Sequence, residues 1–299
     1  NKKISPNTKL ISILGCAQDQ KLLKNLFIEN NVDYVFHAAA YKHVPLVELN
    51  PIQGISNNVF STDSVCKASI SSNIKKVILI SSDKAVRPTN IMGATKRLSE
   101  MIFQANAEEY KSEFSNSKHN TIFSIVRFGN VLGSSGSVVP TFINQINSGG
   151  PITITHPEII RYFMTVAEAA QLVIQASIFA QGGEVFLLDM GNPVKILDLA
   201  KTMIRLSGLT HIDKNNPNGD IEITFTGLRP GEKLYEELLI GNESNSTDHP
   251  LIYKAKENNI SKEILWPKLN TLKNEINNLN TSLVLEILAE LVPEWKRQK

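Results

Sequence analysis

A serine, an aspartate and a lysine stand side by side at Ser82, Asp83 and Lys84, directly after an apolar run at residues 77–80. A carboxylic acid can donate a proton to a leaving group, a lysine that has lost its proton can accept one, and a serine hydroxyl can hydrogen-bond a reacting oxygen. Taken singly, the serine and the aspartate could also cap a turn. Lys96, on a predicted helix that follows, adds a second lysine. The combination indicates an active site.

Met92 lies four residues before Lys96, so the two side chains share one face at the start of the predicted helix. A tyrosine at this place would offer an exchangeable proton, but methionine has none. Proton transfer must therefore use the groups that follow the apolar run, which makes Asp83 and Lys84 the leading candidates.

The elements that would hold these residues alternate along roughly the first two thirds of the chain. Apolar runs predict strands at residues 10–14, 34–36, 77–80, 121–126 and 185–188, and amphipathic stretches predict helices at 20–30, 57–71, 94–110, 166–180 and 282–291. Continuous apolar strands are typical of a parallel sheet buried on both faces. The predicted fold class is therefore α/β, a doubly wound, Rossmann-like parallel sheet with a smaller interleaved substrate domain.

A Gly-x-Gly-x-x-Gly turn, which would hold a dinucleotide pyrophosphate, does not occur in the sequence. We interpret the chain as a fragment whose first strand-turn-helix unit lies upstream of Asn1. The predicted domains are a Rossmann-like, dinucleotide-binding domain at 1–132 and 165–190, a substrate domain at 133–164 and 191–262, and a C-terminal helical segment at 263–299.

Composition narrows the functional class. The 299 residues carry a formal net charge of +2, with 42% hydrophobic and 20% charged residues, so no basic surface for nucleic acid is expected. Cys16 and Cys66 are too few for a disulfide framework, and the histidines show no metal-ligand spacing. The histidine spacing predicts that the chain binds no metal. No apolar run is long enough to cross a bilayer, so the given chain is predicted to be cytoplasmic.

Further polar or small residues follow the other predicted strands, where ligands of open α/β sheets bind. Ala38 and Ala39 would let a cofactor approach the backbone, although tight packing explains alanines equally well. Asn130 follows the strand at 121–126. Arg161 and Arg229 could grip a diphosphate bidentately, or either could form a surface ion pair.

Six ordered blocks make the chain resemble the nucleotide-sugar 4,6-dehydratases of the extended short-chain dehydrogenase/reductase superfamily, in particular the polysaccharide-biosynthesis group acting on UDP-N-acetylglucosamine. The blocks lie at 37–48, 81–97, 127–140, 155–165, 188–200 and 227–238. Met92 in place of the usual tyrosine resembles the branch that retains configuration at C5, which is often fused to an N-terminal membrane region. That implies an association with the cytoplasmic face of the inner membrane through such a region. A homo-oligomer is also compatible with the resemblance.

The resemblance implies tightly held NAD and a UDP-sugar substrate. Hydride leaves sugar C4, water is eliminated across C5 and C6, and hydride returns to C6. The implied NAD contacts are Ala38, Ala39, Asn58, Ser81 and Lys96, and the implied UDP-sugar contacts are Lys42, Asn130, Arg161, Arg229 and Glu232. Cys16 stands where the family commonly has an aspartate near the adenine, so an adenine contact is not expected from it.

Roles within the site follow from this chemistry. Asp83, if burial keeps it protonated, would protonate the departing C6 hydroxyl, and Lys84, if desolvation and Lys96 neutralise it, would take the C5 proton. Ser82 would hydrogen-bond the C4 oxygen. The group that removes the C4 hydroxyl proton stays open between Asp83, Lys84 and Tyr41.

Two other functions are compatible with the sequence. A UDP-sugar 4-epimerase shares the superfamily, but epimerisation needs no acid to expel water. A catalytically inactive nucleotide-sugar-binding domain would suit the missing tyrosine and glycine turn, but it has no physical need for Asp83, Lys84 and Lys96 together.

Overall fold

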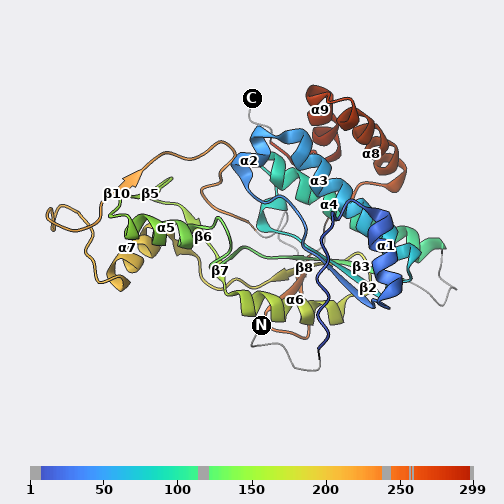
Figure 1. Cartoon of the computed structure of the whole chain (residues 1–299), viewed down its shortest axis with the longest axis horizontal. Helices are drawn as coiled ribbons and strands as arrows, with labels where there is room; N and C mark the ends of the chain where they lie inside the picture. Colours follow the sequence, from blue (N-terminus) through green and yellow to red (C-terminus); the bar gives the residue numbers. More distant parts are fainter. Residues whose placement is uncertain (1–7, 114–120, 238–243, 256, 258, 297–299) are drawn as a thin grey trace.

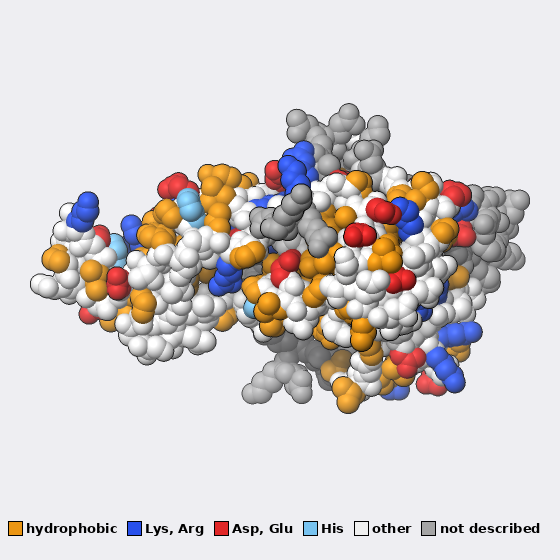
Figure 2. Space-filling model, turned by 90° about the horizontal axis from the view of Figure 1, so that it is seen from above, with side chains coloured by type: hydrophobic (Ala, Val, Ile, Leu, Met, Phe, Trp, Pro, Cys, Tyr) orange, Lys and Arg blue, Asp and Glu red, His pale blue; other side chains and the backbone are white. Residues whose placement is uncertain are grey.

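The computed structural model describes residues 8–113, 121–237, 244–255, 257 and 259–296, and parts of the predicted domains and of the block at 227–238 lie outside them. The chain forms a larger body around a six-stranded sheet and a smaller body that projects from one end of it (Figure 1). In the space-filling view the smaller body is a separate lobe (Figure 2).

The large sheet has the strand order β1-β2-β3-β8-β12-β11. Its strands are β1 (Tyr34–His37), β2 (Lys76–Ile80), β3 (Ile122–Arg127), β8 (Val185–Leu188), β12 (Ile252–Ala255) and β11 (Ser244–Ser246). The first four are parallel, and the last two are antiparallel additions. The register pairs His37 with Leu79 and Ile80 with Val126, so the carboxyl ends of β1, β2 and β3 lie at one edge. This edge is where the candidate residues were expected.

Helices cover both faces of this sheet (Figure 1). On one face lie α3 (Pro51–Ser71) and α4 (Ile91–Glu113), covered in turn by α8 (Lys262–Asn277) and α9 (Thr281–Leu291), while α1 (Gln20–Glu29) packs on α3 and α2 (Val44–Leu49) on α4. On the other lies α6 (Val166–Phe179). None of the helices in the described ranges combines the length and hydropathy needed to cross a bilayer.

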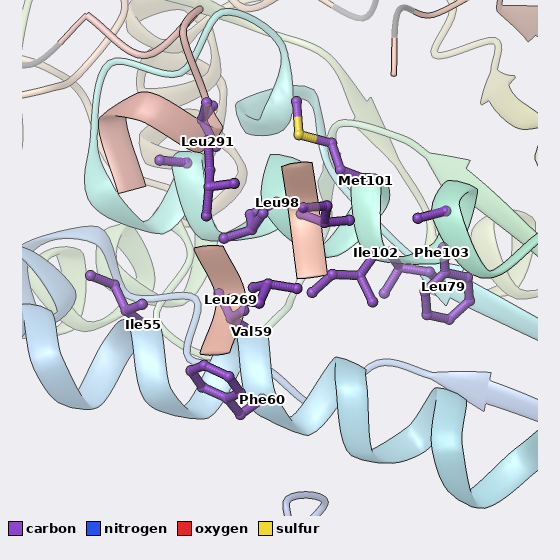
Figure 3. Packing of buried hydrophobic residues seen from close by; sticks show 14 of the residues in the cluster. Ile55, Val59, Phe60, Leu79, Leu98, Met101, Ile102, Phe103, Leu269 and Leu291 are labelled. Atoms are coloured by element: carbon purple, nitrogen blue, oxygen red, sulfur yellow. The ribbon is translucent and has the colours of Figure 1, made fainter. Parts of the chain in front are cut away.

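The main core lies between the sheet and these helices. On α4, Leu98, Met101, Ile102 and Ala105 recur at helical spacing and are all buried. They meet side chains of α3, α8 and α9, including Leu269 of α8 (Figure 3). Each fully buried side chain of this kind contributes about 1.5–3 kcal/mol through the hydrophobic effect. The core therefore fixes α4, which carries Met92 and Lys96, against the sheet.

The smaller body has a core of its own around Phe142, Ile152, Ile204 and Ile221. It contains α5 (Val138–Asn147), β5 (Ile152–Ile154), α7 (Ile196–Leu206) and β10 (Ile223–Phe225). Two short strand pairs join it to the larger body, β4 (Asn130–Val131) with β7 (Phe163–Met164), and β6 (Ile160–Arg161) with β9 (Val194–Lys195).

The α/β fold with a parallel sheet is confirmed, and four of the five predicted strands occur as β1, β2, β3 and β8. The strand predicted at 10–14 is wrong: these residues form no ladder, and Leu14 is fully exposed. Among the described residues β1 is an edge strand that pairs only with β2, and residues 10–14 do not pair with its free edge.

The sheet also extends further along the chain than predicted. The sequence placed 191–262 in the substrate domain, whereas β11 and β12 return to the large sheet and pair beside β8. β12 runs antiparallel to β8, and β11 antiparallel to β12, so the fully parallel pattern ends at β8. The short runs at 244–246 and 252–255 did not reveal these strands. Trp295, within the predicted C-terminal segment at 263–299, is buried in the main core.

Candidate active site

Ser82 and Asp83 lie where β2 ends and a short 3₁₀ turn, η1 (Asp83–Ala85), begins. Ser82 caps this turn by accepting a hydrogen bond from the Lys84 backbone N–H at 3.2 Å, and its hydroxyl donates to Asp83 Oδ1 at 2.8 Å. The Asp83 backbone N–H donates to the carbonyl of Phe128 at 3.2 Å, which ties the turn to the end of β3. The acid is thus held by backbone and side-chain contacts; Ser82 does cap the turn, and its hydrogen bond to the C4 oxygen of a sugar stays a prediction.

The two oxygens of Asp83 have different surroundings. Oδ1 accepts from Ser82 and from the Lys84 ammonium, whereas Oδ2 is buried and has no partner among the described residues. A Cβ on Gly129 would lie 3.3 Å from Oδ2, so the glycine leaves room beside it. One oxygen of the carboxyl group therefore keeps an unused acceptor capacity.

Lys84 lies between two buried carboxylates. Its Nζ is 3.0 Å from Asp83 Oδ1 and 3.5 Å from Glu236 Oε1. Burial lowers the pKa of Lys84, but the carboxylates of Asp83 and Glu236 outweigh this effect, so the pKa lies above the ordinary 10.5. The expectation of a neutral Lys84 is wrong, because the carboxylates favour the ammonium form.

Lys96 is the lysine whose proton is held less tightly. Its Nζ donates to the carbonyl of Ile80 at 2.6 Å, which places it over the end of β2. Burial lowers the pKa of Lys96 to about 8, against the opposing attraction of Glu100. Met92 is buried one turn earlier on α4, as its spacing from Lys96 predicted. Sequence reasoning brought the two lysines to one strand end but assigned the lowered pKa to the wrong one.

The segment after β1 is exposed at Ala38 and Ala39, and beyond them at Tyr41 and Lys42. Asn58 on α3 clamps this segment: its amide accepts from the Tyr41 N–H at 2.7 Å and donates to the Tyr41 carbonyl at 3.0 Å. Its amide nitrogen also donates to a threonine on α4. Asn58 therefore positions the segment, and a direct contact with NAD stays a prediction.

The predicted substrate residues of the smaller body lie between the two bodies. Arg161 donates to the backbone carbonyls of residues 160, 233 and 234, so its guanidinium fastens the segment at 229–237, which we call the strap. Glu232 on the strap accepts from Thr155 at 3.1 Å. Asn130 donates to the carbonyl of Tyr162 at 3.3 Å. Arg229 is exposed.

The strap crosses the turn that follows Lys84. The carbonyl of Gly231 accepts from Thr89 at 2.6 Å and from Asn90 at 3.1 Å, and Lys233 Nζ donates to the carbonyl of Val86 at 2.6 Å. These contacts bring Glu236 against Lys84. Sequence reasoning singled out the block at 227–238 but selected only Arg229 and Glu232 from it, because nothing in the spacing shows which strap carboxylate faces the turn.

Gly231→Ala is expected to lift the strap. Gly231 has φ +72, and a Cβ there would meet the Asn90 Cβ at 2.8 Å and the Thr89 carbonyl oxygen at 2.9 Å. Positive φ alone costs about 1 kcal/mol, and the backbone clash adds about 1–3 kcal/mol. Urea unfolding measures the loss. Gly227→Ala is the matched control, since Gly227 has φ +84 but open space around it, and an equal loss in both variants would contradict a tightly docked strap.

A buried ionic network lies beneath the site. Glu100 on α4 accepts from Ser81 Oγ at 2.6 Å, from Arg127 Nε at 2.7 Å and from Arg127 Nη2 at 2.6 Å. Arg127 also pairs with Glu257, and Arg97 with Glu100. Burial alone would raise the pKa of Glu100, but the two guanidinium groups and the Ser81 hydroxyl lower it below the ordinary 4.5. The Ser81 hydroxyl is thus committed to the network.

Comparison with known proteins matches residues 1–257 to the family described as polysaccharide biosynthesis protein. The capsular polysaccharide biosynthesis protein CapD of Staphylococcus aureus is 46% identical over 288 residues, which cover 96% of this chain and 45% of that protein. The chain thus spans less than half of CapD. A UDP-glucose 4-epimerase of Rickettsia massiliae is 37% identical over 243 residues, covering 81% of this chain and 65% of the epimerase.

Solved structures share the fold. The structure of Pen from Bacillus thuringiensis superposes with a TM-score of 0.71 at 35% identity, covering 84% of this chain and 72% of Pen. More distant structures, at 17% or 18% identity and TM-scores of 0.58 to 0.61, are complexes with NAD. At that identity they show the α/β fold alone.

Proposed function

Since the chain belongs to the polysaccharide biosynthesis protein family, we propose that it carries out NAD-dependent 4,6-dehydration of a UDP-sugar, above all UDP-N-acetylglucosamine. The observation that carries the proposal is the ion pair between the buried Asp83 and the half-buried Lys84 at the end of β2, with one carboxylate oxygen that has no hydrogen-bond partner among the described residues. Elimination of water needs groups that move protons at C5 and C6, and an acid beside a lysine supports that role. The product would be a UDP-4-keto-6-deoxy sugar for surface glycan synthesis.

NAD fits part of the residues present. Ala38 and Ala39 are small and exposed at the carboxyl end of β1, and the Lys96 ammonium lies over the neighbouring strand end, where it would hold the nicotinamide ribose. Ser81 would offer its backbone, because its hydroxyl is used by Glu100. When bound, NAD supplies the acceptor that takes hydride from C4 and gives it back to C6.

The UDP-sugar would lie between the two bodies. Lys42 and Arg229 are exposed cations that would bind the diphosphate, and Asn130 and Glu232 offer an amide and a carboxylate beside the strap. Arg161 would act chiefly by fastening the strap, since its guanidinium is committed to three backbone carbonyls. Met92 in place of the usual tyrosine resembles the branch that retains configuration at C5, and this resemblance supports retention.

A UDP-sugar 4-epimerase is the second candidate, and its support is the similarity to the Rickettsia protein. Epimerisation needs oxidation and reduction at C4 but no proton transfer at C5 or C6. The charged pair at Asp83 and Lys84 is therefore better explained by elimination. A nucleotide-sugar-binding domain without catalytic activity is the third hypothesis.

Incubating the full-length parent protein with UDP-N-acetylglucosamine in deuterated water tests the proposal. We expect NMR to show a 4-keto-6-deoxy product that carries deuterium at C5 with the original configuration, because the proton lost at C5 is replaced from exchangeable groups. A parallel sample in ordinary water is the control. A 4-epimer without deuterium at C5 would instead support the epimerase, and unchanged substrate with tight binding would support the inactive binding domain.

A further inference from the structure

Lys84 has a second carboxylate partner that arrives from the other body. The Glu236 side chain is 4% exposed, and its Oε1 lies 3.5 Å from Lys84 Nζ and 3.8 Å from Arg161 Nε. Its other oxygen, Oε2, is buried without a partner among the described residues. An isolated buried carboxylate is costly, so this position requires the neighbouring cations. The ion pair joins the strap to the reacting turn.

Charged and polar side chains face Lys84 from its own turn, from the strap and from β6, while α4 packs against the turn through Gly93. Asp83 and Ser82 face it from its own turn, Glu236 and Lys233 from the strap, and Arg161 from β6. The two carboxylates attract the Lys84 proton, while burial and Arg161 oppose it. Glu236 thus supplies one of the two charges that decide the protonation of Lys84, and it is the one that depends on the strap.

We propose that Glu236 is a positioning residue that holds Lys84 as a fixed ammonium, so that Lys84 stabilises negative charge on the sugar and the free oxygen of Asp83 takes the C5 proton. This inference rests on the proposed dehydration and deepens it. It reverses the expectation that Lys84 is the base. The geometry supports it because Asp83 Oδ1 is occupied by Lys84 and Ser82, which leaves Oδ2 as the oxygen that can accept.

The proton step balances within the site. After C4 has been oxidised, the C5–H bond breaks, the proton goes to Asp83 Oδ2, and the electron pair moves onto the C4 oxygen, whose charge the Lys84 ammonium offsets. The pair then returns to form the C5–C6 double bond while the C6–O bond breaks, and the departing hydroxide takes the proton from Asp83 and leaves as water. Asp83 and Lys84 end in their starting states. When C4 is oxidised its hydroxyl loses one proton to exchangeable groups, and after the elimination C5 takes one proton back from them, so the protons balance.

Direct titration of Lys84 tests the role of Glu236. In the full-length protein with labelled lysine side chains, NMR assigned by a Lys84→Arg spectrum is expected to place the pKa of Lys84 in Glu236→Gln at least about one unit below that of the unsubstituted protein. Glu237→Gln is the matched control, since Glu237 is the adjacent carboxylate but pairs with the exposed Arg87. An unchanged Lys84 pKa in Glu236→Gln would overturn the proposal.

Activity separates the two possible roles of Lys84 by sign. If the ammonium is required, the alkaline limb of turnover in Glu236→Gln moves to lower pH by the same amount as the pKa of Lys84, and a shift of about one unit lowers turnover roughly tenfold at a pH above both pKa values. If neutral Lys84 were the base, the same substitution would instead raise turnover near pH 9, below both pKa values, which would refute the assignment. Glu236→Asp is expected to restore part of the loss. Absence of any dehydrated product from the unsubstituted protein would reject the proposed function, while the titration would still decide what Glu236 does.

Discussion

Asp83→Asn is expected to abolish dehydration while leaving nucleotide binding almost intact. Asparagine keeps the size of the side chain and an oxygen that can accept a hydrogen bond from Ser82. Its amide cannot take up or release a proton at the pH of the assay. General acid and base groups contribute roughly 10²–10⁴-fold to turnover, so a loss of about 10³-fold is expected, measured by NMR detection of the 4-keto product. Deuterium exchange at C5 should be lost to the same extent.

The control for this variant is Asp198→Asn, at an exposed position on the first turn of α7 in the smaller body. It removes the same charge far from the strand ends and should leave turnover within about twofold, as surface substitutions usually do. Calorimetric binding of UDP should change less than about threefold in Asp83→Asn, because the predicted diphosphate contacts are elsewhere. Turnover near the normal rate in Asp83→Asn would remove Asp83 from the proton-transfer steps.

The sequence predicted this strand end because its information is local. The apolar run at 77–80 specified a buried strand, and the polar residues that follow it had to lie at its carboxyl end. The helix that carries Met92 and Lys96 was predicted from periodicity, although it begins earlier than expected, at Ile91. Both features depend on residues close to one another in the chain.

What the sequence did not predict depends on contacts between distant segments. Glu236 approaches Lys84 only because Gly231 and Lys233 fasten the strap to the turn after η1. The residues that make these contacts are 142 and 147 positions apart in the sequence. The protonation of Lys84 follows from that contact, so local spacing pointed to the wrong lysine. The strand predicted at 10–14 failed for a related reason, since a strand exists only with a partner to pair with.

The second large effect is expected from the ionic network beneath the site. Arg127 ends β3, is fully buried, and donates two hydrogen bonds to Glu100 while also pairing with Glu257. Removing one partner of a buried pair leaves an uncompensated charge, which costs about 3–5 kcal/mol. Arg127→Met keeps an apolar side chain of similar length but leaves the buried Glu100 and Glu257 to share one remaining guanidinium, that of Arg97. We expect its free energy of unfolding in urea to fall by that amount.

Lys268→Met is the control, because Lys268 pairs with Glu290 near the surface of α8 and α9, where such pairs are worth about 0–1 kcal/mol. A similar small loss in Arg127→Met would show that the buried network does not stabilise the fold.

The network also predicts that the free energy of unfolding depends on pH. Since the pKa of Glu100 is lower in the folded protein than its ordinary 4.5, its contribution is complete above that value and is lost as the pH falls through the folded pKa. The difference in free energy of unfolding between Arg127→Met and the unsubstituted protein should therefore shrink in acid. Because Ser81 donates to Glu100 directly before Ser82 and Asp83, the same substitution should also reduce turnover at temperatures where the variant is still folded.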